Sequence, residues 1–150
     1  MSKILITGSR GVVGKTLTRI LKERGHEVFG IDLMHAHGEV GWEHPMAETK
    51  NDYSRCDVAD FRQLERVVRM GFDYVYHCAA EFGRWNGEDF YEQVWRTNAI
   101  GTKNLIRLQE ELGFKLIHFS TSEVYGDYEY IMEESVMDKN PIKQMNDYAL

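Results

Sequence analysis

The sequence has few cysteines and lacks long apolar runs. Cys56 and Cys78 are its only cysteines, and each stands alone in an apolar, strand-like stretch rather than in a metal-binding or disulfide pattern. We interpret both as small core residues of a protein in a reducing compartment. No apolar run reaches the length that spans a membrane, and Met1 leads into a short apolar strand without a signal-peptide pattern. These absences predict a cytoplasmic protein that does not enter a membrane.

Positive charge is also scarce. Lysine and arginine number 18 against 24 acidic residues, and the net charge is −6. Nucleic acids and anionic membranes attract basic patches, so this balance argues against both as partners. It does not restrict small anions, which need only a local positive site. His35, His37 and His44 lie close in sequence, but no cysteine or carboxylate completes a zinc-type set, so no metal site is predicted.

What the sequence does contain is a regular alternation of strand and helix patterns. With 43% hydrophobic residues in a chain of 150, we expect one globular domain. Alternating patterns are typical of βαβ units, which predicts an α/β fold with a parallel sheet flanked by helices. The predicted strands are Lys3–Thr7, Glu27–Asp32, Tyr53–Val58, Asp73–Ala79 and Lys115–Ser120. The predicted helices run from Val13 to Arg24, from Asp60 to Met70, and from the end of the loop Gly83–Gly87 to Leu112.

The third predicted helix has the clearest helical repeat. Its apolar residues recur every three or four positions, which predicts one buried face. That face consists of Tyr91, Val94, Trp95, Asn98, Thr102, Leu105, Leu108 and Leu112. Three other segments are less regular. Met34–Asp52 and Asp127–Asn140 are predicted to be polar loops, and Pro141–Leu150 to be the beginning of a helix.

A glycine-rich turn follows the first predicted strand. Gly8, Gly11 and Gly14 have the spacing GxxGxxG and open the first helix. Glycines let the backbone come close to a pyrophosphate, and the helix N-terminus offers free N–H groups to bind it. We therefore expect a dinucleotide site here, the alternative being a tight strand–helix turn without a ligand. The loop residues expected at the cofactor are Gly8, Ser9, Arg10, Gly11, Val12 and Val13.

The identity of the dinucleotide depends on Asp32. This residue ends the second predicted strand, 24 residues after Gly8. A carboxylate here can accept hydrogen bonds from both ribose hydroxyls and repels a 2′-phosphate, which favours NAD over NADP. Arg10 argues the other way, since an arginine in this loop can hold the extra phosphate of NADP. Its alternative role is that of a solvent-facing side chain. We predict NAD.

Three further parts of the sequence, taken with the glycine turn, carry a resemblance to a known family. They are Thr97–Leu105 with the sequence TNAIGTKNL, Phe119–Gly126 with FSTSEVYG, and Tyr148. With the glycine turn, they resemble the N-terminal half of an extended short-chain dehydrogenase/reductase, of the NAD-dependent nucleotide-sugar epimerase/dehydratase family. The resemblance implies a Rossmann-type NAD(P)-binding domain over residues 1–150, with NAD as cofactor, a nucleotide-sugar substrate and a possible homodimer in a full-length parent.

The resemblance also implies that this domain is incomplete at its C-terminus. The family has a lysine four residues after the position of Tyr148, followed by later strands and a substrate-capping part, all of which would lie beyond Leu150. We therefore expect a parent about twice as long, and no turnover by this chain alone.

Further cofactor contacts follow from the same resemblance. One pair after the third strand matches residues that contact adenine, and small residues end the fourth strand, where bulk would collide with the cofactor. The residues so assigned are Asp57, Val58, Cys78, Ala79 and Ala80. Ordinary strand ends with small or capping residues remain the alternative. Asn98 is expected to brace the fourth and fifth strands near the nicotinamide, because a buried amide must be hydrogen-bonded.

Two hydroxyl residues match the positions that act on the substrate. The resemblance places Thr121 and Tyr148 at the C4 hydroxyl of the sugar, and Tyr148 also at the cofactor. Tyrosine has an ordinary pKa of about 10. A nearby lysine and the cationic nicotinamide lower that pKa, so that the tyrosine can act as a base and C4 can lose hydride. The alternative for Tyr148 is an ordinary surface tyrosine.

Ser122 and Glu123 bear on the reaction that follows. Epimerases of the family commonly carry a small or neutral residue at the position of Glu123, whereas 4,6-dehydratases and uronic acid decarboxylases carry glutamate. In a dehydratase the glutamate removes the C5 proton and water leaves from C6. In a decarboxylase the 4-keto group promotes loss of carbon dioxide. Many dehydratases have Asp-Glu where this chain has Ser122 and Glu123. A solvated loop carboxylate is the alternative for Glu123.

These residues lead to two hypotheses of different classes. The first is an NAD-dependent enzyme that oxidises a nucleotide sugar at C4, with 4,6-dehydration as the leading outcome and epimerisation or decarboxylation as alternatives. The second is a dinucleotide-binding module without turnover, which acts as a redox sensor or a structural part.

Overall fold

The computed structural model describes residues 1–33 and 52–149, without the side chains of residues 84–86. Five parallel strands form one sheet in the order β3-β2-β1-β4-β5. The strands are β1 (Lys3–Thr7), β2 (Glu27–Asp32), β3 (Tyr53–Arg55), β4 (Tyr74–His77) and β5 (Lys115–His118). This order confirms the predicted α/β fold of Rossmann type. Neighbours β1 and β4 mark the point where the chain crosses from one half of the sheet to the other.

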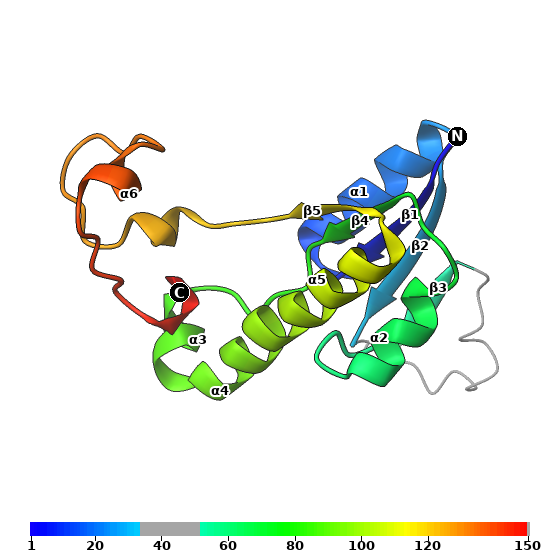
Figure 1. The fold of residues 1–150 in the computed structure, drawn as a ribbon, viewed down its shortest axis with the longest axis horizontal. Helices are drawn as coiled ribbons and strands as arrows, with labels where there is room; N and C mark the ends of the chain where they lie inside the picture. The colour runs from blue at the N-terminus through cyan, green and yellow to red at the C-terminus, as the bar shows by residue number, and fades with distance from the viewer. Residues whose placement is uncertain (34–51, 150) are drawn as a thin grey trace.

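Helices cover both faces of the sheet (Figure 1). One face carries α1 and the other carries α2 and α5. The helices that follow the strands are α1 (Val12–Glu23), α2 (Phe61–Val68), α3 (Arg84–Asp89), α4 (Tyr91–Val94), a π-helical turn η2 (Trp95–Ile100) and α5 (Gly101–Leu112). Short turns follow β5, namely the 3₁₀ turn η3 (Ser122–Tyr125), α6 (Val136–Lys139) and the 3₁₀ turn η4 (Asp147–Ala149).

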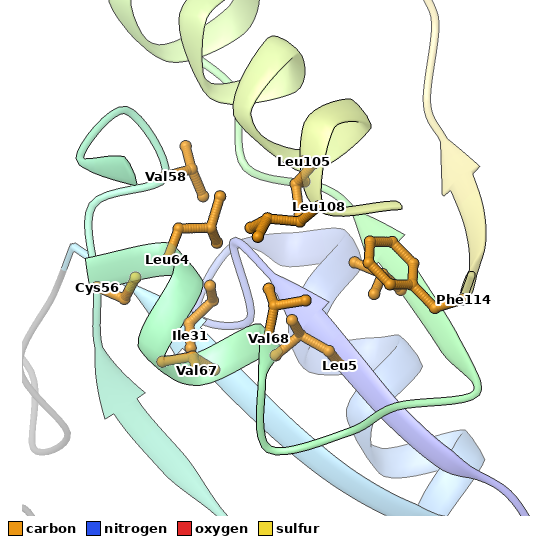
Figure 2. Packing of buried hydrophobic residues seen from close by; sticks show 11 residues of the cluster. Leu5, Ile31, Cys56, Val58, Leu64, Val67, Val68, Leu105, Leu108 and Phe114 are labelled. Atoms are coloured by element: carbon orange, nitrogen blue, oxygen red, sulfur yellow. The ribbon is translucent and has the colours of Figure 1, made fainter. Parts of the chain in front are cut away.

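The core follows from the alternation of side chains along β1. Leu5 points to the face of α2 and α5, where it packs with Leu64 and Leu105 (Figure 2). Its neighbours Ile4 and Ile6 point to the opposite face and pack with α1. Removal of a fully buried leucine of this kind costs about 2–5 kcal/mol. The strand is therefore buried on both faces, as a central parallel strand requires.

Two helix ends form as the sequence indicates. Asp60 caps α2 because its carboxylate accepts hydrogen bonds from the backbone N–H groups of Arg62 and Gln63. Gly113 ends α5 in the left-handed conformation, with φ of 75°. These local signals fix both boundaries to within a residue or two of the prediction.

Several predicted boundaries are wrong. The loop expected over residues 83–87 is largely helical in α3, and the loop expected over 127–140 contains α6. The helix expected over 141–150 is reduced to the three-residue turn η4 in the part that the structure describes. Short segments such as these have no strong helical period of their own, so contacts with neighbouring segments decide their conformation.

The buried face predicted for the third helix is correct only in part. Val94, Leu105 and Leu108 are buried, whereas Tyr91 and Trp95 are exposed, as is Leu112 at the C-terminal end. The π-helical turn η2 separates Tyr91 and Val94 from Leu105 and Leu108. A π-turn has a wider repeat than an α-helix, so the residues before and after it do not share the single face that the 3.6-residue period predicts.

After β5 the chain leaves the sheet, passes through α6 and returns, so that its end lies beside α3 (Figure 1). Among the described residues, no helix is long and apolar enough to cross a membrane. The predicted loop over residues 34–51, with its three histidines, lies outside the described residues. Within the described ranges no group of three or more histidine, cysteine or acidic side chains is placed to hold a metal ion.

Candidate active site

The glycine turn packs directly against the end of β4. Gly8 has φ of 66°, and a Cβ atom there would lie 2.7 Å from the backbone nitrogen of Ala79. Only glycine can combine this left-handed backbone conformation with so close an approach to Ala79. The glycine turn and the end of β4 therefore lie side by side at the carboxyl ends of the strands.

Helix α1 begins without a side-chain cap. Its N-cap residue is Gly11, which offers no side chain to the first N–H groups, and its first turn has no acidic residue. Val12 is 87% exposed although it is apolar, and Val13 beside it is half exposed. Free N–H groups and exposed valines at one helix end suit a ligand that carries both a phosphate group and apolar surface.

A cavity of about 870 Å³ lies over the carboxyl ends of β1, β2 and β4. It brings together most of the residues predicted for the cofactor. Those that line it are Gly8, Gly11, Val12, Val13, Asp32, Asp57, Val58, Cys78, Ala79, Ala80 and Tyr148. Ser9 and Arg10 instead line a separate cleft of about 270 Å³, and Asn98 lines a third cavity of about 430 Å³.

Asp32 and Arg10 are connected through the backbone. One carboxylate oxygen of Asp32 accepts a hydrogen bond of 2.9 Å from the backbone N–H of Arg10. The Arg10 guanidinium lies 4.6 Å from the centre of the Tyr53 ring. Burial, with the charge of Asp32 as the second cause, raises the pKa of Tyr53 to about 12. The Arg10 side chain thus packs on a neutral aromatic ring while Asp32 remains at the cavity.

Asp57 is held from two sides. One carboxylate oxygen accepts a hydrogen bond from the N–H of Ala59, and the other forms an ion pair of 2.6 Å with Arg96 on η2. Asn104 holds the neighbouring residue, because its amide donates to the carbonyl of Val58 at 3.0 Å. Arg96 and Asn104 therefore fix the loop after β3 to η2 and α5.

Asn98 braces the site differently from the prediction. Its side chain accepts a hydrogen bond of 2.9 Å from the N–H of Glu81 and donates one of 2.8 Å to the Glu81 carbonyl. Both bonds go to the segment after β4, whereas the sequence led us to expect a brace between the fourth and fifth strands. The π-turn carries the amide to this segment, a displacement that helical periodicity does not foresee.

A buried histidine connects β4 to β1 and α5. The Thr7 hydroxyl accepts a hydrogen bond from the N–H of Ala79 and is hydrogen-bonded to Nδ1 of His77 at 2.7 Å. The other ring nitrogen, Nε2, is hydrogen-bonded to the Thr102 hydroxyl at 3.0 Å. Burial, with His118 beside the ring as the second cause, lowers the pKa of His77 to about 4. The ring is neutral at physiological pH.

The predicted catalytic residues after β5 lie on a short turn. The Thr121 hydroxyl caps η3 by accepting a hydrogen bond of 3.3 Å from the N–H of Glu123. Ser122 is exposed, whereas Glu123 is half-buried. The carboxylate of Glu123 accepts a hydrogen bond of 3.3 Å from the side-chain amide of Asn146.

Tyr148 lies 27 residues after Thr121, but the two line the same cavity of about 430 Å³. Tyr148 also lines the larger cavity, so it stands where the two meet. Helix α3 supports it from outside, because a Cβ atom on Gly87 would lie 2.8 Å from the Tyr148 nitrogen. The structure thus brings Thr121 and Tyr148 together, with Glu123 attached to the same turn through Asn146.

Several residues of this arrangement were not foreseen from the sequence. Asn146 and Gly87 contact the Tyr148 turn, and His77 joins the strand ends. Asn146 could have been found, because an asparagine directly before a helix-like turn is a common capping pattern. Gly87 and His77 carry no such local signal, since their partners are distant in sequence.

A family model described as the NAD dependent epimerase/dehydratase family matches residues 4–150. Among curated relatives, UDP-glucuronic acid decarboxylase 1 of Danio rerio is 35% identical over 127 residues, which make up 85% of this chain and 29% of that protein. The dTDP-glucose 4,6-dehydratase of Mycobacterium tuberculosis is 27% identical over 149 residues, 98% of this chain and 44% of that protein. The chain thus spans less than half the length of these relatives.

A solved structure shows the same arrangement of elements. The UDP-glucose 4-epimerase of Thermus thermophilus, in complex with NAD, superimposes with a TM-score of 0.75 and 27% identity, over 98% of this chain and 46% of that chain.

Proposed function

Because the chain belongs to the NAD-dependent epimerase/dehydratase family, we propose that it is the cofactor-binding part of a longer enzyme that oxidises a nucleotide sugar at C4. The family match confirms NAD, the cofactor that the sequence indicates. The names of the relatives, a UDP-glucuronic acid decarboxylase and a dTDP-glucose dehydratase, support a nucleotide sugar as the substrate class.

The residues at the sheet edge fit NAD. The cavity of about 870 Å³ is walled by the glycine turn, and α1 begins at its rim without a cap, as a pyrophosphate requires. Asp32 lines the same cavity with a carboxylate that suits the ribose hydroxyls. Asp57 and Val58 would hold the adenine end, and Ala79 and Tyr148 the nicotinamide end. When bound, NAD would supply the oxidant for C4 and the hydride that is needed to form the product.

Thr121 and Tyr148 carry the first step of the proposal. Both residues line the same cavity of about 430 Å³, which supports a role for both at one sugar hydroxyl. Tyr148 takes the proton of the C4 hydroxyl as C4 is oxidised, while Thr121 holds that hydroxyl in place. The single observation that carries the proposal is the assembly of these two residues, distant in sequence, beside the cofactor cavity.

Glu123 carries the second step. We propose that it removes the proton at C5, which the new C4 ketone makes acidic, and gives that proton to the hydroxide that leaves C6 as water. The C5=C6 double bond so formed then takes the hydride back at C6 and a solvent-derived proton at C5. Its half-buried position and its link to the Tyr148 turn support a role at the substrate rather than in bulk solvent. The outcome is 4,6-dehydration.

Product analysis tests this assignment. The full-length protein is incubated with NAD and, in separate reactions, dTDP-glucose, GDP-mannose and UDP-glucuronate. Mass spectrometry of the products distinguishes loss of water, loss of carbon dioxide and an unchanged mass. Loss of water from a hexose nucleotide supports the proposal. Absence of any product under conditions where NAD binds would favour a dinucleotide-binding module without turnover.

Decarboxylation is the second candidate. The relative from Danio rerio, at 35% identity, is a UDP-glucuronic acid decarboxylase. The Thr-Ser-Glu order of residues 121–123 resembles both such decarboxylases and GDP-mannose-type dehydratases, so it does not separate the two reactions. In that reaction the C4 ketone promotes loss of the C6 carboxylate as carbon dioxide, and C5 takes a proton. Conversion of UDP-glucuronate with loss of carbon dioxide, and no loss of water from the other sugars, would establish this candidate instead.

A further inference from the structure

Asn146 lies between two residues that the proposed function places at the substrate. Its side-chain Nδ2 is 3.3 Å from Oε2 of Glu123, and its Oδ1 accepts a hydrogen bond of 2.9 Å from the backbone N–H of Tyr148. We propose that Asn146 is a positioning residue that holds the Glu123 carboxylate in a fixed place relative to Tyr148. The inference rests on the proposed function, because it concerns the step that Glu123 performs after C4 oxidation.

The chemistry of the two contacts explains why an amide stands at this position. The backbone N–H of Tyr148 can only donate, so it must face the amide oxygen. A carboxylate only accepts, so Glu123 must face the amide nitrogen. If the amide were turned over, its NH2 group would face the N–H of Tyr148 and its oxygen would face the Glu123 carboxylate. Neither contact could then be a hydrogen bond. Asparagine satisfies both partners at once, whereas aspartate has no donor for Glu123 and the serine hydroxyl is too short to replace both amide atoms.

The segments on either side of this contact are held in register. Asp127 donates its N–H to the carbonyl of Lys143 at 3.1 Å, and the Gln144 side chain donates to the carbonyl of Val124 at 3.0 Å. Gly126 has φ of 56°, and a Cβ atom there would collide with the Lys143 carbonyl oxygen. The turn that carries Glu123 and the segment before Tyr148 therefore pack as one unit, and Asn146 is its last connection before the cavity.

A purely local role for Asn146 is the competing explanation. Its bond to the N–H of Tyr148 is a capping bond, which aspartate or serine can also form. The contact with Glu123 separates the two roles. Asn146→Ser keeps an acceptor for the cap, but its hydroxyl lies one bond closer to the backbone than Nδ2 and withdraws the donor from Glu123. Asn146→Asp keeps the cap but places a second carboxylate against Glu123.

The test uses the full-length protein with NAD and its substrate in deuterated water. Two steps are measured for each variant, namely cofactor reduction by absorbance and deuterium uptake at C5 by mass spectrometry. Because hydrogen bonds to charged groups are strong, we expect Asn146→Asp to slow C5 exchange by about tenfold or more, and Asn146→Ser by less. Cofactor reduction should change by no more than about threefold in either variant. Equal C5 exchange in wild type and both variants overturns the inference.

A second measurement does not depend on activity. Thermal unfolding is compared for Asn146→Asp, Glu123→Gln and the double variant. The glutamine amide can donate to the introduced carboxylate, so Asn146→Asp should lower the melting temperature less in the Glu123→Gln background than in wild type. Additive effects of the two substitutions would show that the side chains do not interact, which overturns the inference. If they interact but Glu123→Gln leaves turnover unchanged, the proposed role of Glu123 has failed, and the positioning role in catalysis fails with it.

Discussion

The carboxylate of Asp32 accepts a hydrogen bond of 2.9 Å from the backbone nitrogen of Arg10. The end of β2 and the glycine turn are thereby connected directly. The Arg10 side chain, which sequence alone made a candidate for the 2′-phosphate of NADP, lies over the Tyr53 ring. Of these two side chains, the Asp32 carboxylate lines the cavity of about 870 Å³, whereas Arg10 lines a separate cleft.

This relationship predicts the choice of cofactor. NAD should bind more tightly than NADP, because Asp32 repels the 2′-phosphate. Asp32→Asn keeps an oxygen for the Arg10 N–H and removes the charge. Loss of a charged hydrogen bond of about 1.5–3 kcal/mol should weaken NAD binding about 10- to 150-fold. NADP binding should fall much less. Calorimetric titration of both cofactors measures the ratio, with Glu23→Gln on the exposed side of α1 as a control. Equal binding of NADP and NAD by the wild type would refute the assignment.

His77 predicts a specific dependence of stability on pH. Its folded pKa of about 4 lies below the value of about 6.5 for an unfolded histidine. The unfolded chain therefore takes up a proton first as the pH falls. The stabilisation that neutral His77 provides is complete above pH about 6.5 and is lost as the pH falls toward about 4. Within this window the free energy of unfolding falls by at most about 1.4 kcal/mol per pH unit.

His77→Gln isolates this contribution, since glutamine can still donate and accept but does not titrate. Thermal unfolding of both proteins is followed between neutral pH and the acid limit of the window. The wild type should lose stability more steeply, so that the difference between the two proteins shrinks toward acid. Parallel curves would show that His77 is not held neutral.

The surroundings of Gly87 predict that Gly87→Ala, a change that usually stabilises a helix, lowers the free energy of unfolding of this protein. Alanine favours a helix over glycine by about 1 kcal/mol, so Gly87→Ala in α3 should stabilise the protein if the site had room. A Cβ atom at this position would instead lie 2.8 Å from Oδ1 of Asn146 and from the nitrogen of Tyr148. We expect the free energy of unfolding to fall by about 1–3 kcal/mol. Asp89→Ala, at the exposed end of the same helix, is the matched control. A more stable Gly87→Ala variant would show that the contact is absent.

The architecture of the sheet was predictable because its signals are local. The strands β1 and β2, the glycine turn and the capping residue Asp60 depend on signals within a few residues of sequence, and they form as expected. The other strands are shorter than predicted, and β3 ends at Arg55 rather than at Val58. The glycine turn and Asp32 were expected at this cavity from their places after strands, which a parallel sheet brings to one side. The resemblance to the family added the other expected residues that line it, namely Asp57, Val58, Cys78, Ala79, Ala80 and Tyr148.

The remaining features depend on contacts between distant segments. The π-turn changes the direction of Asn98, and no period in the sequence marks it. The segment before Tyr148 shows no regular repeat, because its conformation is set by bonds to the turn after β5, such as that of Gln144 with Val124. Predictions failed where partners far apart in sequence, rather than local propensity, decide the structure.

The central claim is that Thr121 and Tyr148 act at C4 while Glu123 acts afterwards at C5. The most direct measurement follows cofactor absorbance and C5 deuterium together in Thr121→Val, Tyr148→Phe and Glu123→Gln of the full-length protein. The first two variants should abolish cofactor reduction, because both remove a hydroxyl group from the C4 position. Glu123→Gln should still reduce the cofactor, accumulate its reduced form and take up little deuterium at C5. Conversion of substrate by Glu123→Gln at the wild-type rate would contradict the claim and make epimerisation the better assignment.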